Sequence, residues 1–341
     1  MKHLARIASI VLVMALVMLT PGLAAFAQGG TDPQCTGLAE ADCQILLGAN
    51  GTMDTVSAFS IPAWSLNVSF AAEGESVSLT ASGSGEIVLP ADPAAGAEDM
   101  VLHMVIDEAS AVSPDGTESG SLEFILMGNM LYVNIDGEWY GGDISDEMAE
   151  GQEAAGEEMG GAGVANPADI ALALEGLDLS AAVSTTRDAD AEMMGQSMAV
   201  FTTNVDAAQV VVTLLTFPPV LQALMGAMGG DTAGMEEMEL TPEDVQMLGM
   251  IFAPMLAGTQ ISLTRWVGVD DGYIHHIEFV TDLSLDVSMF ASGEGAPTEP
   301  ITGNISLTSD LAGFNESFDI TPPADYRPLE ELEGEAEALG M

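Results

Sequence analysis

The sequence predicts an α+β fold, in which a curved antiparallel β-sheet (a half-barrel) carries helices packed on its concave face. Apolar and polar residues alternate with a period of two in segments such as Trp64–Phe70, a pattern typical of half-buried antiparallel strands. Tight-turn pairs such as Asp136-Gly137 join neighbouring strands directly. Strands come first, helices follow between about 166 and 257, and strands then return. This order favours one sheet covered by helices over alternating βαβ units.

The strands before residue 145 form an antiparallel meander in this interpretation. The period-two pattern recurs in Val77–Ala81 and in Met100–Ile106, with a bend expected at Gly83 and Gly85. Ser119–Met127 and Met130–Ile135 flank Gly128-Asn129, which predicts a two-residue hairpin. After the first helix of the insert we expect further strands at Met198–Val205, Gln260–Val269, Tyr273–Ser288, Ile301–Ser309 and Phe314–Ile320.

The helical insert begins with a short helix over Ala168–Leu177, which follows Asn166-Pro167. Asp206 is a predicted N-cap for a helix that reaches Met228, with a kink at Pro218-Pro219. Thr241-Pro242 begins a last helix that ends near Leu256.

The helices of the insert carry broad, methionine-rich apolar faces. Methionine is flexible and polarizable, and it suits surfaces that accommodate varied apolar partners. A cavity for an apolar ligand is therefore expected between sheet and helices. Its candidate lining residues are Leu214, Leu221, Leu224, Met225, Leu248, Met250, Phe252 and Met255. The alternative is that the same faces are ordinary core that fills the concavity of the sheet.

Residues 1–27 have the three parts of a secretory signal. Lys2 and Arg6 make a basic start, Ile7–Leu19 is almost wholly apolar, and Ala25-Phe26-Ala27 supplies small residues for cleavage. An uncleaved anchor is the alternative, but it usually needs about 20 apolar residues. No cysteine directly follows the apolar run, so no lipid anchor is predicted. We expect a soluble secreted or periplasmic protein with no stable membrane insertion.

Cys35 and Cys43 are the only cysteines. In an exported protein such a close pair favours one local disulfide. A metal site is the alternative, but no histidine lies nearby to complete it. The small loop should tie down the N-terminal segment more than it stabilises the whole fold.

The chain carries 53 Asp and Glu residues against 5 Lys and Arg, which gives a net charge of −48. Removal of residues 1–27 would take away Lys2 and Arg6 and no acid, so the charge would become −50. Such a surface repels nucleic acid and anionic membranes, and it favours a monomer. Adaptation to high salt would account for the acidity. Calcium binding is the competing explanation, but no EF-hand loop is present in the sequence.

The sequence contains no catalytic motif. G-x-S-x-G, H-E-x-x-H and P-loop patterns are missing, so no enzyme activity and no cofactor are predicted. His275 and His276 are adjacent in a predicted strand and should point to opposite faces, which disfavours a shared metal.

We expect four parts: the signal at 1–27, a disulfide-bearing segment at 28–57, a half-barrel domain at 58–328 that contains the insert, and an acidic tail at 329–341.

Three segments resemble the LolA/LppX-like bacterial lipoprotein-carrier superfamily. Met130–Tyr140 looks like its strand, Asp-Gly turn and Trp segment, and Trp266–Phe279 and Phe314–Pro323 are similar to its C-terminal strands. The resemblance covers roughly Ala58–Leu329 and implies a half-open barrel closed by helices around an apolar cavity. The chain departs from the superfamily in its long insert, its acidity and the missing lipid-anchoring cysteine.

Two hypotheses for the function follow. The first is an exported, non-enzymatic carrier or binding protein for a lipid or other apolar ligand. The alternative is an extracytoplasmic structural or interaction protein without a ligand, whose helices serve as core.

Overall fold

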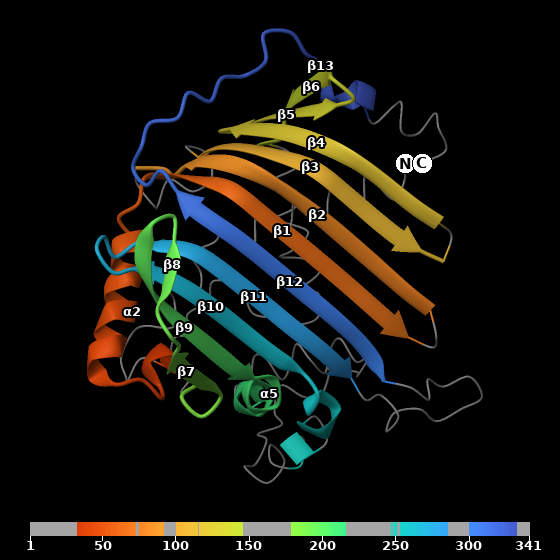
Figure 1. Ribbon diagram of the computed structural model, residues 1–341. Helices are drawn as coiled ribbons and strands as arrows, with labels where there is room; N and C mark the ends of the chain where they lie inside the picture. The colour runs from red at the N-terminus through yellow and green to blue at the C-terminus, as the bar shows by residue number, and fades with distance from the viewer. Residues whose placement is uncertain are drawn as a thin grey trace, which may run out of the picture.

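The computed structural model describes residues 33–72, 75–91, 100–114, 116–145, 179–215, 247, 249–250, 253–285 and 300–332. The strands of these ranges form one thirteen-stranded sheet that follows a single curved surface (Figure 1). The helices are η2 (Pro33–Cys35), α2 (Glu40–Met53) and α5 (Ala207–Leu215). The strands are β1 (Ala58–Ala72), β2 (Glu75–Val88), β3 (Val101–Ser113), β4 (Gly116–Met127), β5 (Met130–Ile135), β6 (Glu138–Asp143), β7 (Val183–Arg187), β8 (Ala191–Met193), β9 (Gln196–Asp206), β10 (Gln260–Gly268), β11 (Ile274–Leu285), β12 (Ile301–Ala312) and β13 (Arg327–Pro328).

Two antiparallel meanders meet in the middle of the sheet. The strand order is β13-β6-β5-β4-β3-β2-β1-β12-β11-β10-β9-β7, and β8 pairs with β9. The junction of the meanders is the β1–β12 pair, where Leu66 lies opposite Leu307. The predicted curved antiparallel sheet is therefore confirmed. The single parallel pairing of this path is the short one between β13 and β6.

Alternation along the strands separates an apolar face from a polar one. In register across β2, β1, β12, β11 and β10, one face presents the row Ala81, Leu66, Leu307, Phe279 and Leu263. The next row on the same face presents Leu79, Val68 and Ile305. We call this side the apolar face. The opposite side, which we call the hydroxyl face, carries Ser65, Asn67, Ser69, Ser78, Thr80, Ser82, Asn304, Ser306 and Thr308.

The predicted turns are confirmed. Asp136 and Gly137 between β5 and β6 both have positive φ, 55° and 88°, which is the conformation of a two-residue hairpin turn. Gly83 lies where β2 and β3 approach so closely that a Cβ atom would be 1.8 Å from the carbonyl oxygen of Val105. The register of the two strands shifts at this glycine.

The N-terminal helix α2 packs on the apolar face at the end where β10 and β11 meet. Its Leu46 and Ala49 are buried against Phe201, Val267 and Ile274. Figure 1 shows α2 beside this end of the sheet. The disulfide between Cys35 and Cys43 is present, with the two Cα atoms 5.1 Å apart, so the predicted pairing is confirmed.

Helix α5 begins where the sequence predicts. The carboxylate of Asp206 accepts a hydrogen bond from the backbone N–H of Gln209 at 3.0 Å, as an N-cap does. The predicted helix Ala168–Leu177 lies outside the described residues, as does the predicted extension of the second helix to Met228. The covering of the concave face by helices therefore stays a prediction. The described part of the insert also contains β7 and β8, which the sequence did not indicate.

The predicted strand at Phe314–Ile320 is wrong. This segment is irregular and crosses from β12 to the β6 edge, where β13 pairs with Tyr140 and Gly141 (Figure 1). Because β1 and β11 already pair with the two sides of β12, the segment that follows β12 cannot pair with it as a further strand. The ring of Phe314 instead stacks on Tyr273, with the centroids 4.4 Å apart.

Candidate ligand-binding face

The apolar face is buried at one end of its strands and exposed at the other. At the end that includes the start of β1 and the end of β2, Ile87 is 0% exposed. Leu102, Leu126 and Leu311 are also buried there. At the opposite end, the cross-strand partners Phe70 and Val77 are 37% and 50% exposed. We call these the closed end and the open end. An apolar ligand could reach the face at the open end without displacing the buried cluster.

Trp64 places a hydrogen-bond donor on the apolar face. It lies opposite Ser309 of β12 and Gly83 of β2, and it packs against the buried cluster of the closed end. Its indole Nε1 atom is buried, and no described residue forms a hydrogen bond with it. Native proteins pair nearly all buried donors, so this N–H is suited to an acceptor oxygen of a bound molecule.

The two other tryptophans point to the opposite side of the sheet. Trp139 lies opposite Asn134, and Trp266 lies opposite His276. Both are on the hydroxyl-face side by strand alternation, since their neighbours Tyr140 and Arg265 belong to the apolar side. Trp64 is therefore on the apolar face, whereas Trp139 and Trp266 are on the other side of the sheet.

The structure describes only part of the predicted cavity lining. Met250 is 65% exposed, Met255 is half-buried, and Leu214 belongs to α5. Leu221, Leu224, Met225, Leu248 and Phe252 lie outside the described residues. The role of all eight in a cavity stays a prediction. The sequence analysis predicts the alternating strand that contains Leu66, Val68 and Phe70, and inward strand residues are expected in the cavity lining, but these three are not named individually among the candidates.

Each histidine of the described ranges bonds a carboxylate. His103 contacts Glu123 at 2.9 Å, His275 contacts Asp271 at 2.9 Å, and His276 contacts Asp310 at 2.5 Å. Within the same ranges, no three His, Cys, Asp or Glu side chains come together as metal ligands. The carboxylates give these rings fixed orientations in the sheet.

Searches for relatives by sequence give no match. The chain matches no protein-family model and no curated protein. No helix in the described part is both long enough and apolar enough to cross a bilayer.

Solved structures similar to this chain include two mycobacterial proteins. The lipoprotein LppX of Mycobacterium tuberculosis is 11% identical, with a TM-score of 0.34, over 82% of this chain and 98% of LppX. LprF of Mycobacterium bovis is 11% identical, with a TM-score of 0.36, over 84% of this chain and 99% of LprF. A Vibrio parahaemolyticus domain described as outer membrane lipoprotein-sorting is 9% identical, with a TM-score of 0.22, over 81% and 93% of the two chains.

The chain is thus similar to solved structures of the kind that its sequence motifs resemble. The resemblance predicted from the sequence is therefore confirmed, as a distant structural similarity. Because the TM-scores lie below 0.5, it does not by itself determine what this chain binds.

Proposed function

We propose that this chain is an exported, non-enzymatic carrier or binding protein that holds a lipid or other apolar ligand against its apolar face. The observation that supports the proposal is the continuous apolar row across β2, β1, β12, β11 and β10, with exposed side chains at the open end. Phe70 and Val77 extend this mostly buried row as exposed apolar side chains, and exposed apolar surface that adjoins a buried cluster can mark a binding site.

The ligand gains its binding free energy mainly from burial of its chain. Each CH₂ group removed from water contributes about 0.8 kcal/mol, so an acyl chain of ordinary length offers ample driving force. In this proposal the helical insert covers the chain from the other side, with Leu221, Leu224, Met225, Leu248 and Phe252 among its contacts. The signal at 1–27 would direct export of the carrier, and its cleavage would leave the carrier free outside the cytoplasm.

Tryptophan quenching by a brominated lipid tests the position of the ligand. In the Trp139→Phe/Trp266→Phe double variant, Trp64 on the apolar face is the remaining tryptophan. We expect saturable quenching of its fluorescence when delipidated protein is titrated with 9,10-dibromostearate. Bromine quenches at close range, so the signal reports a chain that lies near Trp64.

The matched control is Trp64→Phe, which keeps Trp139 and Trp266 on the other side of the sheet. We expect little quenching in that variant although the ligand still binds. If neither protein shows saturable quenching, the chain is better described as a structural or interaction protein whose interior is filled by its own side chains.

A further inference from the structure

Trp64 and Ser309 form a polar pair on the apolar face. They lie opposite each other on β1 and β12, and strand alternation places both on the side of Leu66 and Leu307. Both residues are half-buried, and the indole Nε1 atom is itself buried. Side chains opposite each other in an antiparallel pair have Cβ atoms about 4.5–5.5 Å apart. The indole N–H and the Ser309 hydroxyl can therefore reach the same atom of a ligand.

The next two rows towards the open end offer a ligand few hydrogen bonds. The row of Leu66 and Leu307 is apolar on all five strands from β2 to β10. On the same five strands, the row of Val68 and Ile305 has one hydroxyl group, that of Thr281 on β11. A polar group of the ligand is thus better paired at Trp64 and Ser309 than in either of these rows.

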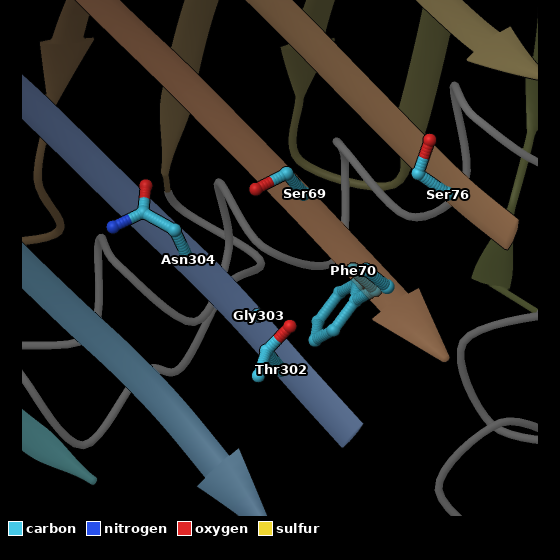
Figure 2. A pocket seen from close by; sticks show the side chains of 7 residues that line it. Ser69, Phe70, Ser76, Thr302, Gly303 and Asn304 are labelled. Atoms are coloured by element: carbon cyan, nitrogen blue, oxygen red, sulfur yellow. The ribbon is translucent and has the colours of Figure 1, made fainter. Parts of the chain in front are cut away.

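Strand β1 leads from this pair to the open end. Phe70 lies six residues after Trp64 on the same side of the strand, about 20 Å away, a span comparable with an extended acyl chain. Figure 2 shows Phe70 at the end of β1, with Gly303 of β12 beside it. In the other direction, the closed end is occupied by the buried side chains of Ile61 and Leu311. A chain that begins at Trp64 therefore extends towards Phe70.

The two donors of the pair match a carbonyl oxygen. A buried donor that stays unpaired costs free energy, and a plain hydrocarbon would pair neither the indole N–H nor the Ser309 hydroxyl. A carbonyl oxygen has two lone pairs and can accept from both donors at once. An alcohol oxygen that accepted from both would leave its own hydrogen without an acceptor in the pair.

We infer that Trp64 and Ser309 bind the acyl carbonyl of the ligand, and that the acyl chain runs from there over Leu66 and Val68 to Phe70. The inference rests on the proposed function, because it presumes that the ligand lies on the apolar face. It adds a ligand class, acyl compounds rather than hydrocarbons or alcohols, and a direction for the chain.

Displacement of the neutral dye N-phenyl-1-naphthylamine by three compounds tests the ligand class. Methyl oleate, oleyl alcohol and (Z)-9-octadecene have the same chain length and unsaturation and differ in the polar group at the end. We expect wild-type protein to bind methyl oleate roughly tenfold more tightly than (Z)-9-octadecene, the effect of hydrogen bonds to a buried donor. Oleyl alcohol should bind with intermediate affinity.

The Trp64→Phe and Ser309→Ala variants each remove one donor. We expect each to lose most of the preference for methyl oleate and to keep its affinity for (Z)-9-octadecene within about threefold, since the row that holds the chain is unchanged. The matched control is Ser306→Ala, which removes a hydroxyl from the same strand on the hydroxyl face, where Ser306 lies opposite Asn67. The preference should survive in this control.

Nuclear magnetic resonance of the indole N–H tests the contact in folded protein. In the Trp139→Phe/Trp266→Phe variant, the ¹⁵N-labelled indole of Trp64 gives a single N–H signal. Methyl oleate should move its proton downfield because a hydrogen bond to the carbonyl forms, and (Z)-9-octadecene should not. An indole proton that responds alike to both bound compounds would contradict the contact.

Bromine position tests the direction of the chain. In the same variant we expect methyl 4,5-dibromooctadecanoate to quench Trp64 more strongly than methyl 15,16-dibromooctadecanoate at saturation, because its bromines are near the carbonyl. Stronger quenching by the second ester would reverse the direction and overturn this part of the inference.

The outcomes separate the inference from the proposed function. If no compound displaces the dye and dibromostearate does not quench Trp64, the proposed function fails. If the compounds bind but the methyl oleate preference is absent, or survives in both Trp64→Phe and Ser309→Ala, the carbonyl site is wrong while the carrier stands.

Discussion

The guanidinium of Arg265 donates a 2.6 Å hydrogen bond to the side-chain oxygen of Gln34, 231 residues earlier in the chain. Arg265 lies on β10 under the N-terminal segment and is only 5% exposed. The other basic residues after position 27 are Arg187 and Arg327. Arg187 contacts Asp42 of α2 at 3.6 Å, and Arg327 donates to Glu138 of β6 at 3.1 Å. Arg265 and Arg187 therefore bond the N-terminal segment to the sheet, and Arg327 bonds the C-terminal segment to β6.

Replacement of Arg265 by methionine should destabilise the protein strongly. The change removes bonds to Gln34 and Thr203 and leaves polar side chains buried without their charged partner. Loss of a buried charged partner costs roughly 2–4 kcal/mol of unfolding free energy. Urea denaturation monitored by circular dichroism measures this difference.

Arg327→Met is the matched control, because Arg327 forms its contacts at the surface. Exposed ion pairs contribute about 0–1 kcal/mol, so this variant should remain close to wild type. Equal losses in the two variants would contradict a special role for the buried arginine.

The sequence predicted the local features of the fold well. The meander, the hairpin turns, the Asp206 cap and the disulfide are set by residues close together in the chain. The β1–β12 junction depends on partners about 240 positions apart, such as Leu66 and Leu307, and no local pattern specifies it. The prediction of a strand at Phe314–Ile320 was wrong for the same reason, because the local pattern does not show that β12 already has two neighbouring strands.

The candidate site was harder to predict than the fold. Alternation in Trp64–Phe70 marks one side of β1 as apolar, but ordinary core strands have the same pattern. What distinguishes this face is the gradient from the buried Ile87 to the exposed Phe70 and Val77, and exposure depends on the assembled sheet. Residues 69–71 and 302–304 become neighbours only through the β1–β12 pairing.

The disulfide should stabilise the N-terminal segment locally. Closing a loop between cysteines separated by eight positions contributes about 2–3 kcal/mol in the chain-entropy description. This segment is joined to β7 by a 2.7 Å hydrogen bond from the Thr185 N–H to the Thr36 carbonyl oxygen. In Cys35→Ser/Cys43→Ser, hydrogen exchange should accelerate in residues 33–53 and β7 and stay unchanged in β1 and β12. Uniform acceleration over the sheet would show that the bridge supports the whole fold instead.

Two glycine-to-alanine substitutions should change the unfolding free energy in opposite directions. At Gly83 a Cβ atom would collide with the backbone oxygen of Val105 at 1.8 Å, and neither strand can move without loss of ladder hydrogen bonds. Gly83→Ala should therefore cost about 2–4 kcal/mol. Gly48 lies exposed inside α2, with nothing within 4 Å of the same atom, so Gly48→Ala should stabilise by about 0.5–1 kcal/mol. Thermal unfolding of both variants measures the two effects, and a shift of the same sign in both would refute this account of Gly83.

The melting temperature should rise with NaCl. The chain has 53 acidic residues against 5 basic ones, so repulsion among carboxylates outweighs the few ion pairs that salt weakens. Screening shortens the range of this repulsion from about 30 Å at 0.01 M to about 3 Å at 1 M salt. We expect an increase of roughly 5–10 °C over that interval, which corresponds to 2–3 kcal/mol for a domain of this size. Choline chloride should give a similar rise, because the effect depends on ionic strength. A rise with micromolar CaCl₂ and none with NaCl would instead assign the acidity to calcium binding.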